Sequence, residues 1–360
     1  MKNRLFLPWI CFVLLLTQFS GATPSYSSLD KLISKNDNLD GFFAFNPSES
    51  IQKQGVVLLV HGLNTKPQKM NSIANVLKQH QMDVFQIHLS GHQGDIEKMK
   101  LVTLDIWQRD FAKAYIAAKN YADSINKPLY FVGFSLGAAL ATSMISEYSI
   151  QFEKMVLFAP AIAIHKTSEW IKYLFFWGLD TVIPSLSPES YRANSEGTTL
   201  AAYKALLQLT EANKNSAHKT HQLNVPTLVF IDPEDELVSD SGLKKFKADQ
   251  NLNQWQFFEI TNIQHLLKKS YHHLIIDEDS LGPVVWKKVS TAMVHHLLGK
   301  DIAIEKNMKA RICDSATIWS TSRNKYCKED FWPSCDRKIY SCNKDRSPLN
   351  IKSDSQLMHP

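Results

Sequence analysis

Nine consecutive residues carry the strongest structural signal in this chain: Leu129-Tyr130-Phe131-Val132-Gly133-Phe134-Ser135-Leu136-Gly137. They begin as a short apolar run rich in aromatic and β-branched side chains, which is typical of a buried strand. Beyond them, apolar side chains recur through residue 144 at the spacing of one helix face. A serine on a tight strand-to-helix turn exposes its hydroxyl, and glycines two residues away on each side leave room for that turn. The pattern therefore predicts Ser135 as a catalytic nucleophile.

Strand and helix signals alternate on both sides of this turn, from residue 50 to about residue 160. Val56–Val60 is a continuous apolar run, as expected of a parallel strand that is covered on both faces. Asp83–Leu89 and Met155–Phe158 are further strand candidates, and Phe42–Phe45 is a candidate edge strand. Helical periodicity lies between the strands, for example in the apolar stripe from Leu104 to Tyr121.

The alternation is interrupted between about residue 162 and residue 222, where strand signals are missing and aromatic, helix-like pieces occur. It resumes with strands at Val225–Ile231 and Trp255–Ile260 and a closing helix at Val284–Leu298. The sequence therefore predicts an α/β fold over residues 23–300, with a doubly wound, mostly parallel sheet. The interruption, at about 162–222, predicts a helical cap over the carboxyl ends of the strands.

The amino terminus has the pattern of a secretory signal. Lys2 and Arg4 precede the apolar run Leu5–Thr17, and Ser20-Gly21-Ala22 supplies small residues for cleavage. We expect residues 1–22 to be a cleaved signal peptide and the protein to be exported, to the periplasm or the medium. An uncleaved anchor is the alternative, although the apolar run is shorter than the roughly 20 residues that span a bilayer.

Four cysteines follow the leader, all in a polar tail over residues 301–360: Cys313, Cys327, Cys335 and Cys342. An even number of cysteines in a short polar segment of an exported protein predicts disulfides, in any of the three pairings that four cysteines allow. Zinc is the competing interpretation. The tail contains no Cys-x-x-Cys pair, so we predict no metal.

Composition limits the class of protein. Of the 360 residues, 44% are hydrophobic and 21% are charged, which is typical of a globular protein. The formal net charge of +5 is small and dispersed, which argues against nucleic-acid binding.

A serine hydroxyl needs a histidine base, and that histidine needs a carboxylate that orients it. The strand that ends at Ile231 runs into the acidic loop Asp232-Pro233-Glu234-Asp235-Glu236. Asp235, a few residues into the turn, is the first candidate for the acid, and Asp232 is the second. A solvated acidic turn is the structural alternative for this cluster.

Three histidines follow the last strand and are candidates for the base. The local pattern favours His273, and the spacing from the acid favours His265. His272 is the third candidate.

The oxyanion formed during acyl transfer needs two backbone N–H donors. One is expected from Leu136, which follows the nucleophile, and the other from Leu63, in the turn after the first buried strand. His61, in the same turn, is expected to bond loop backbone and to have no role as a base.

Together these motifs resemble the α/β-hydrolase superfamily, in particular its monoglyceride lipase and lysophospholipase-like branch of the serine aminopeptidase S33 type. The resemblance covers residues 50–300. It rests on His61-Gly62 after a strand, Leu89–Gly94, the turn at Ser135, Asp235 with Val238, and His273–Glu278. Members of this branch have a helical cap after the sixth strand and hydrolyse carboxylic esters without a cofactor.

The resemblance implies a serine hydrolase with the triad Ser135, Asp235 and His273, acting on a small-molecule or lipid ester such as a monoacylglycerol or lysophospholipid, and the amino-terminal pattern adds the expectation of export. Peripheral contact with membrane lipid is a further expectation, and no cofactor is expected. Two other functions stay open. An aminopeptidase-like enzyme of the same fold would need a cluster of acidic side chains in the cap for the substrate's ammonium group, and a non-catalytic binding protein would use the same scaffold.

Overall fold

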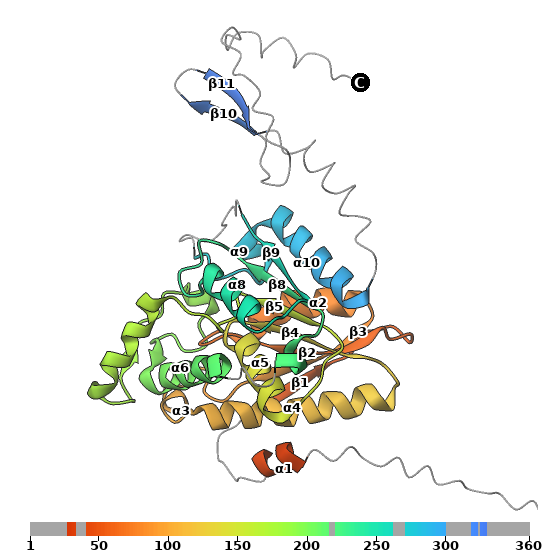
Figure 1. Ribbon diagram of the computed structural model, residues 1–360, viewed down its shortest axis with the longest axis vertical. Helices are drawn as coiled ribbons and strands as arrows, with labels where there is room; N and C mark the ends of the chain where they lie inside the picture. The colour runs from red at the N-terminus through yellow and green to blue at the C-terminus, as the bar shows by residue number, and fades with distance from the viewer. Residues whose placement is uncertain are drawn as a thin grey trace, which may run out of the picture.

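A seven-stranded sheet forms the centre of the computed structural model, which describes residues 27–33, 41–215, 220–261, 271–299, 318–322 and 325–329 (Figure 1). The strand order is β1-β3-β2-β4-β5-β8-β9, and only the edge strand β1 is antiparallel to its neighbour. The strands are β1 (Phe42–Asn46), β2 (Gly55–Val60), β3 (Met82–His88), β4 (Leu129–Phe134), β5 (Met155–Phe158), β8 (Thr227–Ile231) and β9 (Trp255–Glu259).

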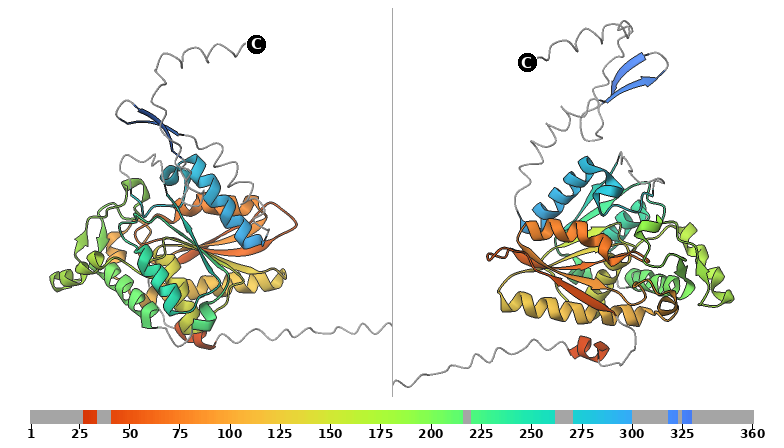
Figure 2. Two further views of the ribbon diagram at one scale, coloured as in Figure 1. Left: turned by 45° about the horizontal axis from the view of Figure 1, so that its top comes forward. Right: turned by 180° about the vertical axis from the view of Figure 1, so that it is seen from behind.

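Helices cover both faces of this sheet, which explains why its central strands are apolar at every position. The helices α2 (Asn71–Gln79) and α10 (Pro283–Leu298) pack against each other on one face. The long helix α4 (Leu104–Ser124) lies on the other face with α5 (Leu136–Tyr148) beside it (Figure 2). All residues of β2 and β4 are buried, as expected for parallel strands between two helical layers.

Short helices complete the domain. A 3₁₀ turn, η1 (Pro67–Met70), leads into α2, and α1 (Ser27–Ile33) packs against α4. Outside the insertion between β5 and β8, the domain also contains α3 (Ile96–Lys100), α8 (Asp240–Asp249) and α9 (Glu278–Leu281).

A long insertion separates β5 from β8 and projects from one end of the molecule, at the left of Figure 1. Its elements are the 3₁₀ helix η2 (Lys166–Trp177), β6 (Val182–Ile183), η3 (Glu189–Tyr191), β7 (Thr198–Thr199), α6 (Leu200–Asn215) and α7 (Thr220–Leu223). The strands β6 and β7 pair with each other, so the expectation that this region has no strands is wrong. Strands of two residues are too short to show alternation in a sequence.

The insertion is tied at its start and at its middle to loops that follow strands of the central sheet. At its start, the backbone N–H groups of Ser239 and His165 donate to the carbonyls of Ala163 and Leu237, which joins the insertion to the loop after β8. At its middle, the N–H of Lys66 donates to the carbonyl of Tyr191, which joins the insertion to the loop after β2. The insertion is thereby fixed over the carboxyl ends of β2 and β8.

Only part of the polar tail is described. A hairpin of β10 (Ile318–Ser322) and β11 (Lys325–Glu329) lies in it, and β11 contains Cys327. Cys313, Cys335 and Cys342 lie outside the described residues, as does the leader, so disulfides and export stay predictions. Within the described part of the chain, no helix combines the length and apolarity that a membrane crossing requires.

Candidate active site

Ser135 occupies a strained turn between β4 and α5. Its backbone angles are φ 50° and ψ −111°, a region that residues with a side chain rarely adopt. Its N–H donates to the carbonyl of Phe158 at 2.9 Å, which ties the turn to the neighbouring strand β5. Strain of this kind is held in place by the surrounding structure and is concentrated at functional sites.

The two glycines of the turn allow close packing. A Cβ on Gly137 would lie 2.7 Å from the carbonyl oxygens of both Val60 and His61, so a side chain there would push α5 away from β2. A Cβ on Gly133 would lie 2.6 Å from the ring of Phe131. These contacts give the physical reason for the glycine pattern around the serine.

The side chains of Ser135, His273 and Asp235 form one hydrogen-bonded chain. His273 Nε2 lies 2.8 Å from Ser135 Oγ, and His273 Nδ1 lies 2.8 Å from Asp235 Oδ2. A carboxylate only accepts, so Nδ1 carries the ring proton and Nε2 is free to accept the serine proton. All three residues are buried, with exposed fractions of 6% or less. This arrangement can activate a serine nucleophile.

The Asp235 carboxylate is itself held in place. Its Oδ1 accepts the backbone N–H groups of Leu237 and Val238, each at 2.8 Å, which leaves Oδ2 for the histidine. The apolar pair after the aspartate thus supplies the N–H groups that orient it. Asp232 is held similarly, since its Oδ1 accepts the N–H of Glu234 at 2.8 Å. Asp235 differs in that its histidine also contacts Ser135.

The remaining described candidates pair with each other. His272 Nδ1 lies 2.7 Å from Asp232 Oδ2, while His272 Nε2 lies 3.6 Å from a carboxylate oxygen of Glu234. Burial lowers the pKa of His272, but the hydrogen bond to Asp232 and the nearby carboxylates outweigh it and raise this pKa overall. His272 thus serves a second histidine–carboxylate pair and makes no hydrogen bond to Ser135. His265 lies outside the described residues.

The two expected oxyanion donors belong to two loops that meet beside the nucleophile. Leu136 is the first residue of α5, and Leu63 lines the cavity above Ser135. The N–H of Gly137 donates to the carbonyl of His61 at 3.1 Å, which joins the loop of Leu63 to the start of α5. This hydrogen bond sets the spacing between the two loops that would supply the donors.

His61 is a structural residue, as the sequence indicated. It is fully buried; its Nε2 accepts the N–H of Leu89 at 3.1 Å and its Nδ1 donates to the carbonyl of Gly62 at 2.9 Å. Burial, followed by the nearby His92, holds its pKa well below the ordinary value, so the ring is neutral. Both nitrogens are occupied by backbone, and none remains for a substrate.

Asn64 has a role that the sequence did not reveal. It is buried with a positive φ of 47°, and its amide nitrogen donates to the carbonyls of Asn194 and Gly197 at 3.2 and 2.8 Å. Its Oδ1 accepts the N–H of Asn194 at 2.8 Å. The residue after Leu63 is therefore clamped to the insertion. Its partners lie 130 and 133 positions away in the chain, so no local signal could indicate them.

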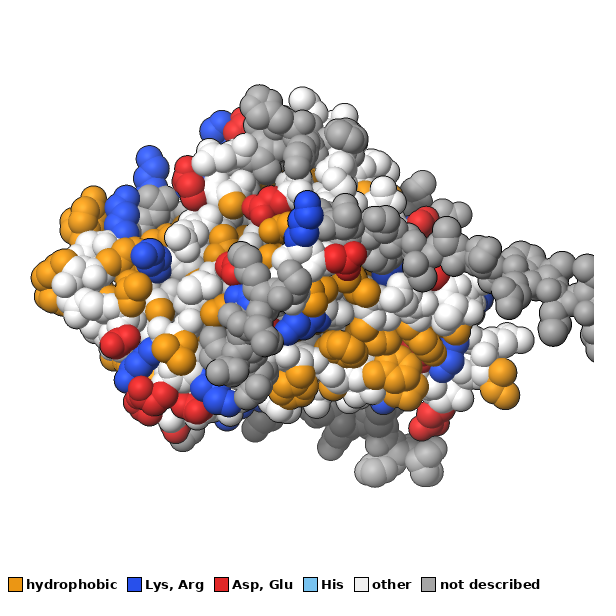
Figure 3. Space-filling model, turned by 90° about the horizontal axis from the view of Figure 1, so that it is seen from below, with side chains coloured by type: hydrophobic (Ala, Val, Ile, Leu, Met, Phe, Trp, Pro, Cys, Tyr) orange, Lys and Arg blue, Asp and Glu red, His pale blue; other side chains and the backbone are white. Residues whose placement is uncertain are grey.

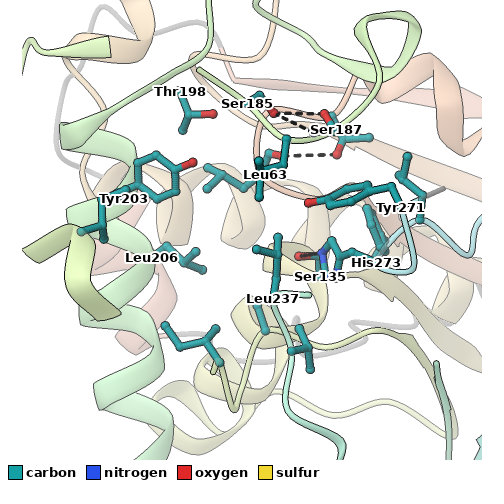
Figure 4. A pocket seen from close by; sticks show the side chains of 18 of the residues that line it. Leu63, Ser135, Ser185, Ser187, Thr198, Tyr203, Leu206, Leu237, Tyr271 and His273 are labelled. Atoms are coloured by element: carbon teal, nitrogen blue, oxygen red, sulfur yellow. Dashed lines mark hydrogen bonds between the residues drawn. The ribbon is translucent and has the colours of Figure 1, made fainter. Parts of the chain in front are cut away.

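A cavity opens above the serine and has two different sides (Figure 4). Leu206 and Leu237 lie in the lower part of this view, and the hydroxyls of Thr198, Ser185 and Ser187 lie in its upper part, where Leu63 is also found. Neither lysine, arginine, aspartate nor glutamate occurs among the described residues that line it. The hydroxyl-bearing side chains apart from Ser135 are Thr65, Ser185, Ser187, Thr198, Tyr203 and Tyr271.

The fold and the hydrogen-bonded serine define an α/β-hydrolase. The "Serine aminopeptidase, S33" family model matches residues 51–279, more than half of the chain, and the chain belongs to this family. The comparisons thus confirm the superfamily that the sequence motifs predicted.

Curated relatives and solved structures agree with this assignment. The chain is 26% identical to a thermostable monoacylglycerol lipase of Bacillus sp. (strain H-257) over 62% of its own length and 88% of the relative. It is 25% identical to the monoglyceride lipase of Rattus norvegicus over 45% of its own length and 53% of that protein, about half of it. The structure of a soluble variant of monoglyceride lipase from Saccharomyces cerevisiae has the same fold, with a TM-score of 0.61, 13% identity and coverage of 73% of this chain and 92% of that one. These likenesses confirm the monoglyceride lipase-like branch and support an enzyme of the lipase and esterase type.

Proposed function

We propose that this protein is an exported serine carboxylic-ester hydrolase that cleaves monoacylglycerol-like esters through an acyl-enzyme. The observation that carries the proposal is the Ser135–His273–Asp235 hydrogen-bonded chain at the floor of a cavity whose described lining has no lysine, arginine, aspartate or glutamate. Monoacylglycerol lipases among the relatives support the substrate class.

The first half of the reaction forms the acyl-enzyme. Ser135 Oγ attacks the acyl carbon of the ester while its proton passes to His273 Nε2, and Asp235 stabilises the imidazolium that results. The N–H groups of Leu63 and Leu136 receive the oxyanion. The tetrahedral intermediate then loses the alcohol, which takes the proton from His273.

The second half reverses these roles with water as the nucleophile. His273 takes a proton from water as the hydroxide attacks the acyl carbon, and it returns a proton to Ser135 Oγ as the acid leaves. The products are a carboxylic acid and an alcohol. No cofactor or metal takes part in this scheme.

The lining of the cavity favours a neutral polyol as the alcohol part. Leucine side chains such as Leu206 and Leu237 would contact the acyl chain, and Thr198 and Tyr203 would present hydroxyls to the glycerol (Figure 4). A lysophospholipid headgroup would call for arginine or lysine beside its phosphate. The described lining has none, so monoacylglycerol is preferred to lysophospholipid.

The same lining bears on the aminopeptidase alternative that the family name raises. A peptidase that removes amino-terminal residues needs a carboxylate beside the substrate's ammonium group. Acidic side chains do not occur among the described residues that line the cavity. An ester hydrolase is therefore the better-supported activity.

The insertion is proposed to act as a cap that contacts membrane lipid. Its η2 helix contributes Ile171 to the cavity, while Trp170 and Phe176 are 71% and 76% exposed. Hydrophobic side chains gather at this end of the molecule beside basic side chains, at the left of Figure 3. Tryptophan favours the boundary between water and lipid, so η2 would bring the cavity close to a bilayer that contains the substrate.

The test measures hydrolysis by the full chain, produced with export, of monoacylglycerol, lysophosphatidylcholine and an amino-acid anilide, beside Ser135→Ala. Tyr203→Phe removes one hydroxyl from the polar side and keeps the ring. It is expected to lower kcat/KM for monoacylglycerol about five- to tenfold, the value of one hydrogen bond, and to leave a methyl ester of the same acid unchanged. Faster cleavage of the anilide than of any ester would overturn the proposal.

Two further measurements address location. A mature amino terminus at Thr23, found by mass spectrometry, is the result expected for a cleaved signal. Trp170→Ser with Phe176→Ser is expected to weaken sedimentation with anionic vesicles while hydrolysis of a water-soluble ester stays constant. Unchanged sedimentation would contradict the cap's contact with lipid.

A further inference from the structure

The acidic loop after β8 holds the histidine segment in a way that the reaction scheme does not use. Glu236 Oε1 accepts the backbone N–H of His272 at 3.1 Å, and Glu236 Oε2 accepts the N–H of His273 at 3.1 Å. One carboxylate thus binds two successive peptide groups, with one oxygen on each. Its side chain reaches across 36 and 37 positions of sequence to do so.

Two more carboxylates of the loop, Asp232 and Asp235, hold the side chains of the same two residues. Asp232 receives the ring of His272, and Asp235 receives the ring of His273. Backbone and side chains of this pair are therefore fixed from one loop, by three carboxylates with separate tasks. A hydrogen bond to a charged acceptor is stronger than one between neutral groups, so a carboxylate side chain suits this purpose.

The backbone of His273 determines where its ring lies relative to Ser135. The hydrogen bond to Asp235 holds the His273 ring at Nδ1 only. A shift of the His273 peptide would move Nε2 away from Ser135 Oγ, which lies 2.8 Å from it. A misplacement of about 1 Å in a catalytic group can cost about 100-fold in rate. The peptide N–H on the Glu236 carboxylate opposes such a shift.

We propose that Glu236 is a positioning residue, which places the histidine base through its backbone. The inference rests on the proposed ester hydrolase for its kinetic readout only. Glu236 acts through His273 and contacts no substrate, so its loss should lower kcat and spare KM.

The test compares Glu236→Gln and Glu236→Ala with Glu259→Gln, a control that removes an exposed carboxylate paired with Lys244 at the end of β9. Glu236→Ala is expected to lower kcat about 10- to 100-fold with KM unchanged. Glu236→Gln keeps one acceptor oxygen, so its kcat should lie between those of the alanine variant and the wild type. The control should retain full activity, and all variants should unfold at nearly the same temperature.

A second readout needs no substrate. The far-downfield proton resonance of the His273–Asp235 hydrogen bond reports the position of the ring, and it is expected to broaden or shift in Glu236→Ala and to stay in place in the control. A wild type without esterase activity that still shows this difference would leave the positioning role standing and remove the proposed function. Unchanged kcat and resonance in both Glu236 variants, or a loss of kcat matched by loss of the folded state in both, would overturn the role.

Discussion

Because the turn at Ser135 is strained, we predict that glycine at this position gives a more stable protein than alanine does. Glycine usually has the opposite effect. A residue with a Cβ at φ 50° and ψ −111° stores about 1–3 kcal/mol of backbone strain. Ser135→Gly removes this strain, while Ser135→Ala keeps it. Both variants lose the hydroxyl that contacts His273, so the difference between them isolates the backbone term.

The expected magnitude is a difference of two effects. Glycine loses more backbone freedom on folding than alanine, by about 0.5–1 kcal/mol. Subtracting this from the strain leaves Ser135→Gly more stable than Ser135→Ala by about 1 kcal/mol, within limits of about 0 and about 2.5 kcal/mol. For a domain of this size, that is a rise of a few degrees in melting temperature. Denaturant unfolding of the two inactive variants measures it directly.

Ser146 provides the matched control on the same helix. It is buried near the end of α5, and its hydroxyl donates to the carbonyl of Thr142. In this helical backbone, Ser146→Gly should be less stable than Ser146→Ala by about 1 kcal/mol. The difference in stability between the glycine and alanine variants should therefore have opposite signs at Ser135 and at Ser146. If Ser135→Gly were also the less stable of its pair, the strain assigned to this turn would be refuted.

Three other perturbations test the site. Asp235→Asn should lower kcat about 10⁴-fold, because the amide selects the wrong tautomer of His273. Asp232→Asn should lower kcat far less. Equal losses of ester hydrolysis in the two variants would contradict the pairing of acids and bases. Asn64→Ala removes three side-chain hydrogen bonds. It should lower kcat, and it should lower the free energy of unfolding by about 1–3 kcal/mol. A variant that unfolds in urea like the wild type would show that these bonds do not hold the insertion. Burial raises the pKa of Asp110 to about 6, against an unfolded value of about 3.9, so the folded chain holds its proton more tightly. Stability should fall as the pH rises from about 4 to 6, by on the order of 2–3 kcal/mol; Asp110→Asn should abolish this fall, and a pH dependence that persisted in the variant would reassign it.

Local sequence determined a large part of this structure. The apolar runs of β2 and β4 are buried on both faces, which makes their strand character independent of distant residues. The serine turn needs glycines within two positions, because those positions face the neighbouring strand and helix at contact distance. These features depend on periodicity and on backbone sterics, which a linear pattern records directly.

The position of the insertion between two strands was predicted from the sequence, but its secondary structure was predicted only in part. Its boundaries follow from the interrupted alternation, yet η2 is a 3₁₀ helix and β6 and β7 are strands of two residues. Short elements of this kind are stabilised by their neighbours and have too few residues to show a period.

The sequence by itself determined the α/β architecture, the nucleophile turn and the set of acids and histidines near the site. The tertiary structure alone decided which of them meet: His273 with Asp235, His272 with Asp232, and Asn64 with the insertion. The physical reason is distance along the chain. Partners separated by 38 to 138 positions are brought together by the parallel sheet, whose strand ends converge at one edge, and hydrogen-bond geometry there selects among residues that are chemically alike.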